Sequence, residues 1–281
     1  MKIKVSADST CDLSPELIET YDIGITPLYI VRGGESLKDG IEIRPQDIYD
    51  YVNSGKGVCS TAAVSVGDYI EFFGEALKTH DAVVHMTISS DMSACFQNAM
   101  QAAEEFPGRV FPVDARNLST GIGQLVLTAA ELAADGMDAA DIQAELNVRR
   151  EKLDVSFVLD TLFYLHKGGR CSSVAALGAN LLSLKPCIEV RAGKMGVGKK
   201  YRGNLKKCML AYVNDKLVGK DDLDYRRIFI THTDLDPEIL QAVKDAVAAS
   251  GPWEEILETM AGGTISNHCG PGCLGVLFYH K

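Results

Sequence analysis

The sequence predicts an α/β protein with two domains. Apolar, β-branched runs alternate along the chain with segments of helical periodicity, which is the pattern of α/β folds. The length of 281 residues suggests two domains at about 150 residues each. A hydrophobic content of 46% with 23% charged residues is ordinary for globular proteins and excludes wholesale disorder.

The first half alternates strands and helices, each helix having a recognisable start or stop. Ser14 with Pro15, and Ser65 with Asp68, are typical N-terminal helix signals. Gly136 ends another predicted helix. We expect strands at 3–7, 25–31, 41–43, 81–88 and 110–113, and helices at 15–21, 45–53, 66–78, 94–106, 117–134 and 139–153.

The second half continues the alternation and adds a hairpin turned at 192–194. We expect strands at 155–159, 188–191, 197–201, 228–232, 256–260 and 274–279, and helices at 162–166, 174–182, 205–218 and 237–249. We place the domain boundary near 153, which gives an N-terminal α/β domain at 1–153 and a C-terminal α/β domain at 154–281. Each is expected to be a β-sheet flanked by helices.

Charge and apolar runs exclude several classes of protein. The net charge of −10 argues against a nucleic-acid partner or an anionic-membrane surface. No run approaches the roughly 20 apolar residues of a spanning helix, and the N-terminus resembles no signal peptide. We therefore expect a cytoplasmic protein without an integral membrane segment. Eight cysteines without a Cys-x-x-Cys pair predict buried, reduced thiols and no metal site.

The common nucleotide and hydrolase motifs are absent. The sequence contains no Walker phosphate loop, no G-x-S-x-G elbow and no H-E-x-x-H zinc motif. Residues 270–275 fit G-x-G-x-x-G, but that motif requires a following helix to hold the pyrophosphate. Only six residues follow, and they resemble a strand, so we reject a dinucleotide site.

Three segments share one design, in which a hydroxyl-rich turn follows a strand and precedes a helix. In a parallel sheet, such turns lie at one edge, where helix N-termini present free N–H groups. Neither a lysine nor a glycine-rich cradle accompanies them, so a carboxylate suits them better than a polyphosphate. Because serine and threonine are also common N-caps, structural roles stay open. The hydroxyls are those of Ser60, Thr61, Ser65, Ser89, Ser90, Ser93, Ser119 and Thr120.

Three cationic or titratable side chains complete the candidate set. His268 precedes Gly-Pro-Gly, which we interpret as a tight turn where the backbone approaches a ligand closely. Arg170 follows a Gly-Gly pair typical of a helix C-cap, and suits a carboxylate, a phosphate or a protein interface. Arg202 ends a basic run that forms either a solvated surface or a docking surface for a partner. A structural role for His268 also stays open.

The ordered set of motifs resembles the DegV family, the bacterial fatty-acid-binding proteins of two-component fatty-acid kinases. The resemblance covers nearly the whole chain and lies in residues 8–13 (DSTCDL), 60–65 (STAAVS), 93–95 (SAC), 114–123, 161–170 (TLFYLHKGGR), 184–186 (LKP) and 268–272 (HCGPG). Two departures stand out. The middle three residues of 60–65 differ from the family's pattern, and Ala94-Cys95 replaces its Gly-Thr.

This resemblance implies a DegV-like fold of two domains that binds a long-chain fatty acid. Thr61, Ser93 and His268 would hold the carboxylate, with Ser65, Ser119 and Arg170 as further ligand-binding residues, while the acyl chain lies in an apolar tunnel. The protein would act as a carrier without catalytic residues or cofactor. It would present the acid to a separate ATP-binding subunit resembling dihydroxyacetone kinase, docked in part by Arg202, which makes acyl phosphate for phospholipid synthesis.

Two other functions stay open at this point. One is a stand-alone serine hydrolase with Ser93 as nucleophile and His268 as base, although no acid partner is evident and the two groups must come within about 3 Å. The other is a sensor for a small carboxylate. Burial of each CH₂ contributes about 0.8 kcal/mol, so dependence of binding on chain length separates a fatty-acid carrier from such a sensor.

Overall fold

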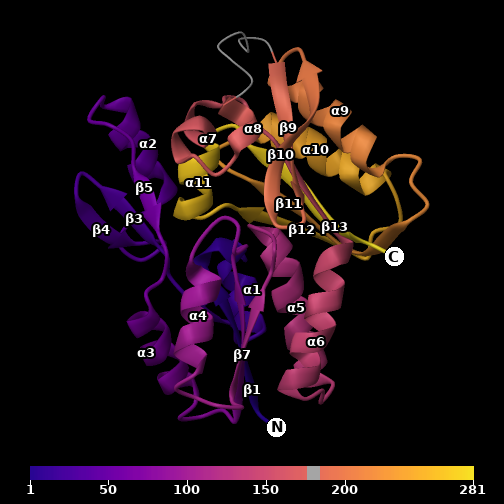
Figure 1. Ribbon diagram of the computed structural model, residues 1–281. Helices are drawn as coiled ribbons and strands as arrows, with labels where there is room; N and C mark the ends of the chain where they lie inside the picture. The colour runs from indigo at the N-terminus through magenta and orange to yellow at the C-terminus, as the bar shows by residue number, and fades with distance from the viewer. Residues whose placement is uncertain (176–183) are drawn as a thin grey trace. The chain divides into compact units, whose positions relative to one another are not determined.

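The predicted α/β class is confirmed. The computed structural model describes residues 1–175 and 184–281, which divide into two compact units (Figure 1). The first comprises Met1–Glu151 with Gly262–Ile265, and the second comprises Lys152–Ala261 with Ser266–Lys281. Of the helix predicted at 174–182, residues 176–182 lie outside the described residues, and a short helix α8 (Ser172–Ala175) precedes them.

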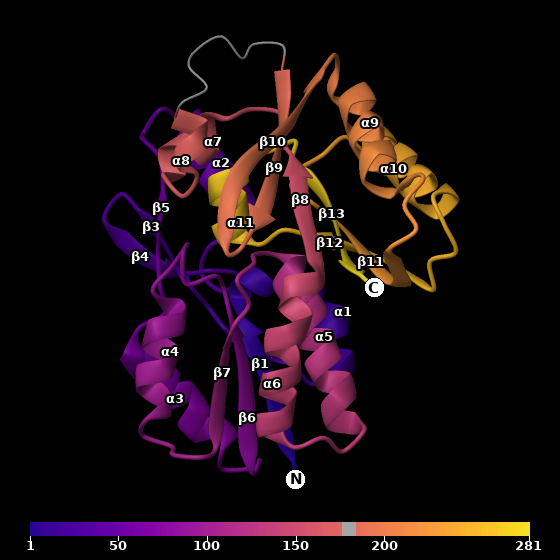
Figure 2. The same ribbon diagram turned by 45° about the vertical axis from the view of Figure 1, so that its right-hand side comes forward.

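The centre of the first unit is a parallel sheet with the strand order β2-β1-β6-β7. Its strands are β1 (Ile3–Asp8), β2 (Gly24–Thr26), β6 (Ala82–Thr87) and β7 (Val110–Asp114). Every residue of β6 is buried, since helices cover both faces of the sheet. Figure 2 shows α3 (Val66–Ala76) with α4 (Cys95–Ala103) on one side and α5 (Thr120–Ala134) with α6 (Ala139–Arg149) on the other.

Local signals fix where these helices begin. The hydroxyl of Ser14 accepts from the backbone N–H of Leu17 at 3.3 Å, with Pro15 opening α1 (Pro15–Thr20). Ser65 and Asp68 form the expected reciprocal capping box of α3. The prediction for 139–153 was too long, because α6 gives way to a 3₁₀ turn, η2 (Arg150–Lys152), before the next strand begins.

A second, antiparallel sheet of the first unit has the order β4-β3-β5. It contains β3 (Tyr29–Arg32), β4 (Glu35–Lys38) and β5 (Ser60–Ala62), and α2 (Pro45–Asn53) follows β4. The single strand predicted at 25–31 is wrong. It is divided between two sheets, since Pro27 lacks the N–H that a ladder needs. The strand predicted at 41–43 is also wrong, because these residues form a turn with one isolated bridge at Ile43.

The second unit is built on a mixed sheet with the order β10-β9-β8-β13-β11-β12. Its strands are β8 (Leu153–Val158), β9 (Leu184–Arg191), β10 (Lys194–Arg202), β11 (Leu223–His232), β12 (Glu255–Met260) and β13 (Leu274–His280). Helices α9 (Leu205–Leu217) and α10 (Pro237–Ala249) pack together over one face (Figure 1). Side chains such as Tyr212, Val243 and Phe278 form the core between them.

Two short helices carry the motifs of the C-terminal half. Helix α7 (Phe163–Gly168) holds the Tyr-Leu-His-Lys-Gly sequence, and α11 (Gly263–Cys269) leads into the Gly-Pro-Gly turn. The prediction that His268 lies in a tight loop is wrong. The residue lies in the last turn of α11. All eight cysteines are buried and free, as predicted.

Candidate functional site

Thr61 and Ser93 lie in two segments of the first unit. Ser93 follows β6 in the turn before α4, at the carboxyl edge of the parallel sheet, as predicted. Thr61 lies instead in β5 and pairs with Ile30, so the expectation that its turn follows a parallel strand is wrong. The Asn98 side-chain amide donates to the Val64 carbonyl at 2.7 Å, which ties the segment after β5 to α4.

The Ser93 hydroxyl forms two hydrogen bonds with Cys95. It donates to the Cys95 sulfur at 3.2 Å and accepts from the Cys95 backbone N–H at 3.4 Å. Burial, reinforced by the charge of Asp8, raises the pKa of the Cys95 thiol to about 12. Cys95 is therefore a protonated thiol at neutral pH.

A buried polar network lies behind Cys95. Asp8 accepts from the Tyr69 hydroxyl at 2.6 Å and lies 3.2 Å from Nε2 of His85, whose Nδ1 is 2.9 Å from the Ser6 hydroxyl. Ser6, His85 and Asp8 are ordered like a hydrolase triad, but each is 0% exposed, so no substrate reaches them. Sequence reasoning missed this network, although Asp8 opens the DSTCDL motif that carried the family resemblance.

Two predicted ligand-binding serines are engaged in structural hydrogen bonds. The Ser65 hydroxyl donates to Asp68 at 2.6 Å within the cap of α3. The Ser119 hydroxyl donates to Asp12 at 2.6 Å, and its backbone adopts the unusual φ of 53° at the start of α5. The hydroxyl proton of each is thus directed at a carboxylate of the same unit.

Asp12 and Asp39 hold the segment at the start of α11. The N–H of Gly262 donates to Asp12 at 2.8 Å, and the N–H groups of Gly263 and Thr264 donate to Asp39 at 2.8 and 2.9 Å. The Thr264 hydroxyl also donates to Asp39. Burial raises the pKa of Asp12 to about 7, against the lowering effect of the bonds from Ser119 and Gly262.

The second unit brings His268 and Arg170 together. Burial, followed by the positive charge of Arg170, lowers the pKa of His268 to about 4, so its imidazole is neutral at pH 7. Arg170 is exposed, and its guanidinium donates to the Gly168 carbonyl at 2.7 Å. A neutral imidazole beside a guanidinium offers N–H donors in a locally positive field, which suits an anionic oxygen ligand.

Two glycines explain why the motifs 161–170 and 268–272 occur together. A Cβ built on Gly168 would lie 2.0 Å from Nδ1 of His268, so only glycine lets α7 approach this ring. Gly270, at φ +70°, would place a Cβ 2.2 Å from the Tyr164 ring. Each motif therefore supplies the space that an aromatic or imidazole ring of the other motif occupies.

The remaining basic candidates differ in their surroundings. Lys185 of the Lys-Pro motif forms an ion pair with Asp160 at 2.5 Å. Arg202 is exposed at the end of β10, and no ion pair to it is found among residues 1–175 and 184–281. This location is compatible with a contact to another molecule.

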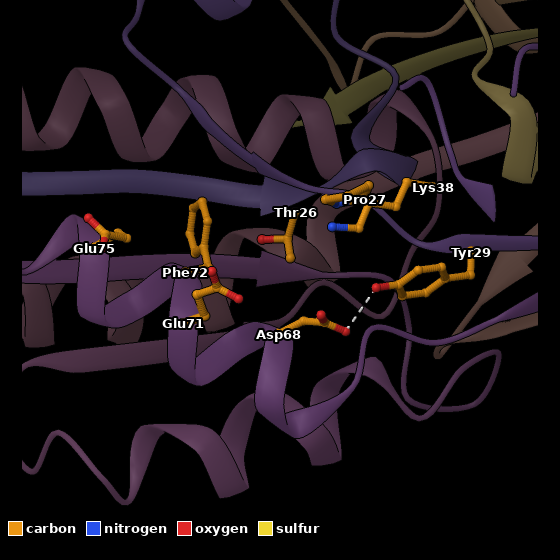
Figure 3. A pocket seen from close by; sticks show the side chains of 8 residues that line it. All are labelled: Thr26, Pro27, Tyr29, Lys38, Asp68, Glu71, Phe72 and Glu75. Carbon is orange, nitrogen blue, oxygen red and sulfur yellow. Dashed lines mark hydrogen bonds between the residues drawn. The ribbon is translucent and has the colours of Figure 1, made fainter. Parts of the chain in front are cut away.

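One pocket of the first unit does not suit an acyl chain. It has a volume of about 260 Å³ and lies between α3 and the segment from β2 to β4 (Figure 3). Asp68 accepts from the Tyr29 hydroxyl at 3.1 Å across it. The lining side chains, four of them charged, are Thr26, Pro27, Tyr29, Lys38, Asp68, Glu71, Phe72 and Glu75. Burying methylene groups there would desolvate charges, which opposes the hydrophobic gain.

Two kinds of feature are not found in the part of the chain that the structure describes. No cluster of three His, Cys, Asp or Glu side chains there is arranged to hold a metal ion. No helix among the same residues has the length and apolar character needed to cross a membrane.

Comparisons with known proteins agree with these motifs. A family model described as "Uncharacterised protein, DegV family" matches residues 2–281. A DegV domain-containing protein of Caldanaerobacter subterraneus is 31% identical, with 100% of this chain and 99% of that protein covered. A protein of Thermotoga maritima named as a fatty acid-binding protein is 28% identical, with 98% and 96% covered.

A solved structure extends the similarity to the fold. A DegV family protein from Thermus thermophilus, described by its fatty acid binding, is 34% identical with a TM-score of 0.89, and the match covers 100% of both chains. The similarity thus runs through every element described above. The chain belongs to the DegV family.

Proposed function

We propose that this protein binds a long-chain fatty acid and carries it without transforming it. The observation that carries the proposal is the pairing of a neutral His268 with Arg170 in the second unit, a donor set suited to a carboxylate. The relative from T. thermophilus, which is similar over its whole length, is described by its fatty acid binding.

The proposal assigns the carboxylate to three principal donors. The hydroxyls of Thr61 and Ser93 and the neutral imidazole of His268 each donate one hydrogen bond to it, and Arg170 adds positive charge. Ser65 and Ser119 act indirectly, because their protons are held by Asp68 and Asp12. Bonds to a charged group contribute about 1.5–3 kcal/mol each, so they fix the orientation of the head group.

The acyl chain supplies most of the affinity in this proposal. An apolar tunnel buries the methylene groups, each worth about 0.8 kcal/mol. Such a tunnel is lined by ordinary core side chains, which explains why the sequence reveals the head-group residues and not the tail site.

The resemblance to the DegV family supports a further assignment. The bound acid is presented to a separate ATP-dependent subunit resembling dihydroxyacetone kinase, which forms acyl phosphate for phospholipid synthesis in the cytoplasm. Arg202, exposed at the end of β10, is a docking residue in this proposal. The nucleotide belongs to the kinase subunit, so the carrier needs no cofactor of its own.

Hydrolysis by Ser93 and His268 is less well supported. A general base works best with a pKa near the operating pH, and the pKa of His268 is lowered to about 4. The Ser93 hydroxyl donates to a sulfur atom rather than to an imidazole. Stoichiometric labelling of Ser93 by a serine-reactive probe would instead support hydrolysis.

The proposed binding function is tested by extracting the protein, produced in bacteria, with organic solvent. Mass spectrometry of the extract is expected to show long-chain acids in amounts comparable to the protein. Finding no acyl chain, together with no binding of added palmitate or oleate, would contradict the proposal.

The carrier role is tested separately in an assay reconstituted with the kinase subunit. His268→Ala is expected to lower the rate of acyl-phosphate formation, because the carboxylate loses one of its donors. Turnover by this variant at the normal rate would show that His268 does not hold the carboxylate.

A further inference from the structure

The buried network behind Ser93 has a fixed direction of donation. Asp8 is 0% exposed and receives the Tyr69 hydroxyl at 2.6 Å, the Ile88 N–H at 3.1 Å and Nε2 of His85 at 3.2 Å. An ionised carboxylate only accepts hydrogen bonds. Each of these groups must therefore direct its proton at Asp8, including the single proton of Tyr69.

The charge of Asp8 acts on both Tyr69 and Cys95. Burial and the charge of Asp8 raise the pKa of Tyr69 well above its usual value, so the phenol stays protonated. Its hydroxyl donates a hydrogen bond to Asp8. Burial and the charge of Asp8 also raise the pKa of the Cys95 thiol, to about 12, so its sulfur stays protonated and neutral. This neutral sulfur accepts a hydrogen bond from the Ser93 hydroxyl at 3.2 Å.

From this geometry we propose that Cys95 sets how readily Ser93 donates its proton to the ligand. The inference rests on the proposed function, in which the Ser93 hydroxyl contacts the fatty-acid carboxylate. In the structure, this hydroxyl donates to the Cys95 sulfur at 3.2 Å. When the carboxylate arrives, the hydroxyl rotates and exchanges the sulfur for the anionic oxygen.

Sulfur makes this exchange favourable. A thiol sulfur is a weak acceptor, whereas a bond to a carboxylate is charge-assisted and about twice as strong as a neutral one. A hydroxyl oxygen at position 95 would compete more strongly for the Ser93 proton. Position 95 is a cysteine in this chain, so the Ser93 hydroxyl faces a weak acceptor, and Cys95 acts as a positioning residue.

The test compares Cys95→Ser with Cys95→Ala in binding of palmitate and of its methyl ester. We expect Cys95→Ser to weaken palmitate binding about fivefold, the equivalent of about 1 kcal/mol, and to change methyl ester binding less than twofold. Cys95→Ala removes the competing acceptor, so its palmitate affinity should stay within twofold of the unsubstituted protein. A purely packing role predicts the opposite order, with the smaller alanine being worse.

A second measurement uses the unsubstituted protein. The S–H stretching band of Cys95, identified by its absence in Cys95→Ala, should shift when palmitate binds and stay in place with the methyl ester. Equal palmitate affinity of all three proteins, or an unmoved band, would overturn the role of Cys95 while leaving fatty-acid binding intact. Failure of the unsubstituted protein to bind palmitate would instead contradict the proposed function.

Discussion

Gly168 shows what one residue contributes to the candidate site. From the sequence, we interpreted Gly168 and Gly169 together as a helix C-cap. This is right for Gly169, which caps α7 in the left-handed region at φ 68°. Position 168 requires glycine for a different reason, because the His268 ring lies too close to leave room for a side chain. That contact joins residues 100 positions apart, so no local pattern predicts it, although both residues were visible as parts of motifs.

The two glycines give a matched pair of substitutions. Gly168→Ala is expected to displace the His268 ring and weaken fatty-acid binding at least tenfold, about 1.4 kcal/mol. Gly169→Ala meets no atom within 4 Å and adds only left-handed backbone strain of about 1–2 kcal/mol, which lowers stability. Calorimetric titration with palmitate measures both. Unchanged binding by Gly168→Ala would show that the position of the ring is unimportant.

The protonation of His268 is a second prediction at the residue scale. NMR titration of its ring protons in the ligand-free protein should give a midpoint near 4, since burial and Arg170 lower the pKa from 6.5 to about 4. The neutral ring then contributes stability that is fully present above 6.5 and is lost as the pH falls towards 4. Arg170→Ala should raise the midpoint, and a midpoint near 6.5 in the unsubstituted protein would be inconsistent with the buried site.

At the scale of elements, the most informative error concerns α11. The sequence predicted a tight turn around His268 because Gly-Pro-Gly follows it. The helix forms because Asp39 accepts from the N–H groups of Gly263 and Thr264. These bonds join residues 224 and 225 positions apart, so local propensity does not contain them. By contrast, the caps at Ser14 and Ser65 are local and were predicted.

Asp12 makes the anchoring of this helix dependent on pH. Its pKa is about 7 in the fold against 3.8 for an ordinary aspartate, so the folded protein binds the extra proton between these values. The contribution of Asp12 to the free energy of unfolding should therefore fall by on the order of 4 kcal/mol as pH rises from about 4 to 7, opposite in sign to the contribution of His268.

Urea denaturation across this pH range tests the role of Asp12. Asp12→Asn does not ionise and loses this contribution, so its stability should rise more steeply with pH than that of the unsubstituted protein. The exposed Asp135 at the end of α5 provides the control, because Asp135→Asn should leave the profile unchanged. The same slope in Asp12→Asn as in the unsubstituted protein would show that another group causes the dependence.

At the scale of the whole molecule, periodicity was sufficient for the fold class and for most elements. Periodicity failed where pairing with a neighbouring strand determines the structure. Residues 25–31 were predicted as one strand but are divided between two sheets. The polar strand β4 (Glu35–Lys38) was not predicted, because it is stabilised by pairing with β3. For the proposed site, sequence patterns singled out Thr61, Ser93, His268 and Arg170 as candidates, and these stay predictions. The network from Cys95 to Asp8 depends on the packing of α3 against the parallel sheet, which only the folded chain shows.

Dependence on chain length is a prediction about the molecule as a carrier. Each two-methylene extension of the ligand should tighten binding about fifteenfold, since two buried CH₂ groups contribute about 1.6 kcal/mol, until the proposed tunnel is filled. Palmitate should accordingly raise the melting temperature far more than hexanoate at equal concentration. Equal shifts with both acids would favour a sensor for small carboxylates.

Native mass spectrometry tests the central claim most directly. The protein purified from bacteria should carry the added mass of one long-chain fatty acid, and Thr61→Ala combined with Ser93→Ala should lose it while remaining folded. Two exposed hydroxyls of the first unit provide the control, because Ser54→Ala with Thr79→Ala should keep the ligand. An unsubstituted protein that carries no acyl mass and takes up no added palmitate would contradict the account, as would a Thr61/Ser93 double variant that holds the acid equally firmly.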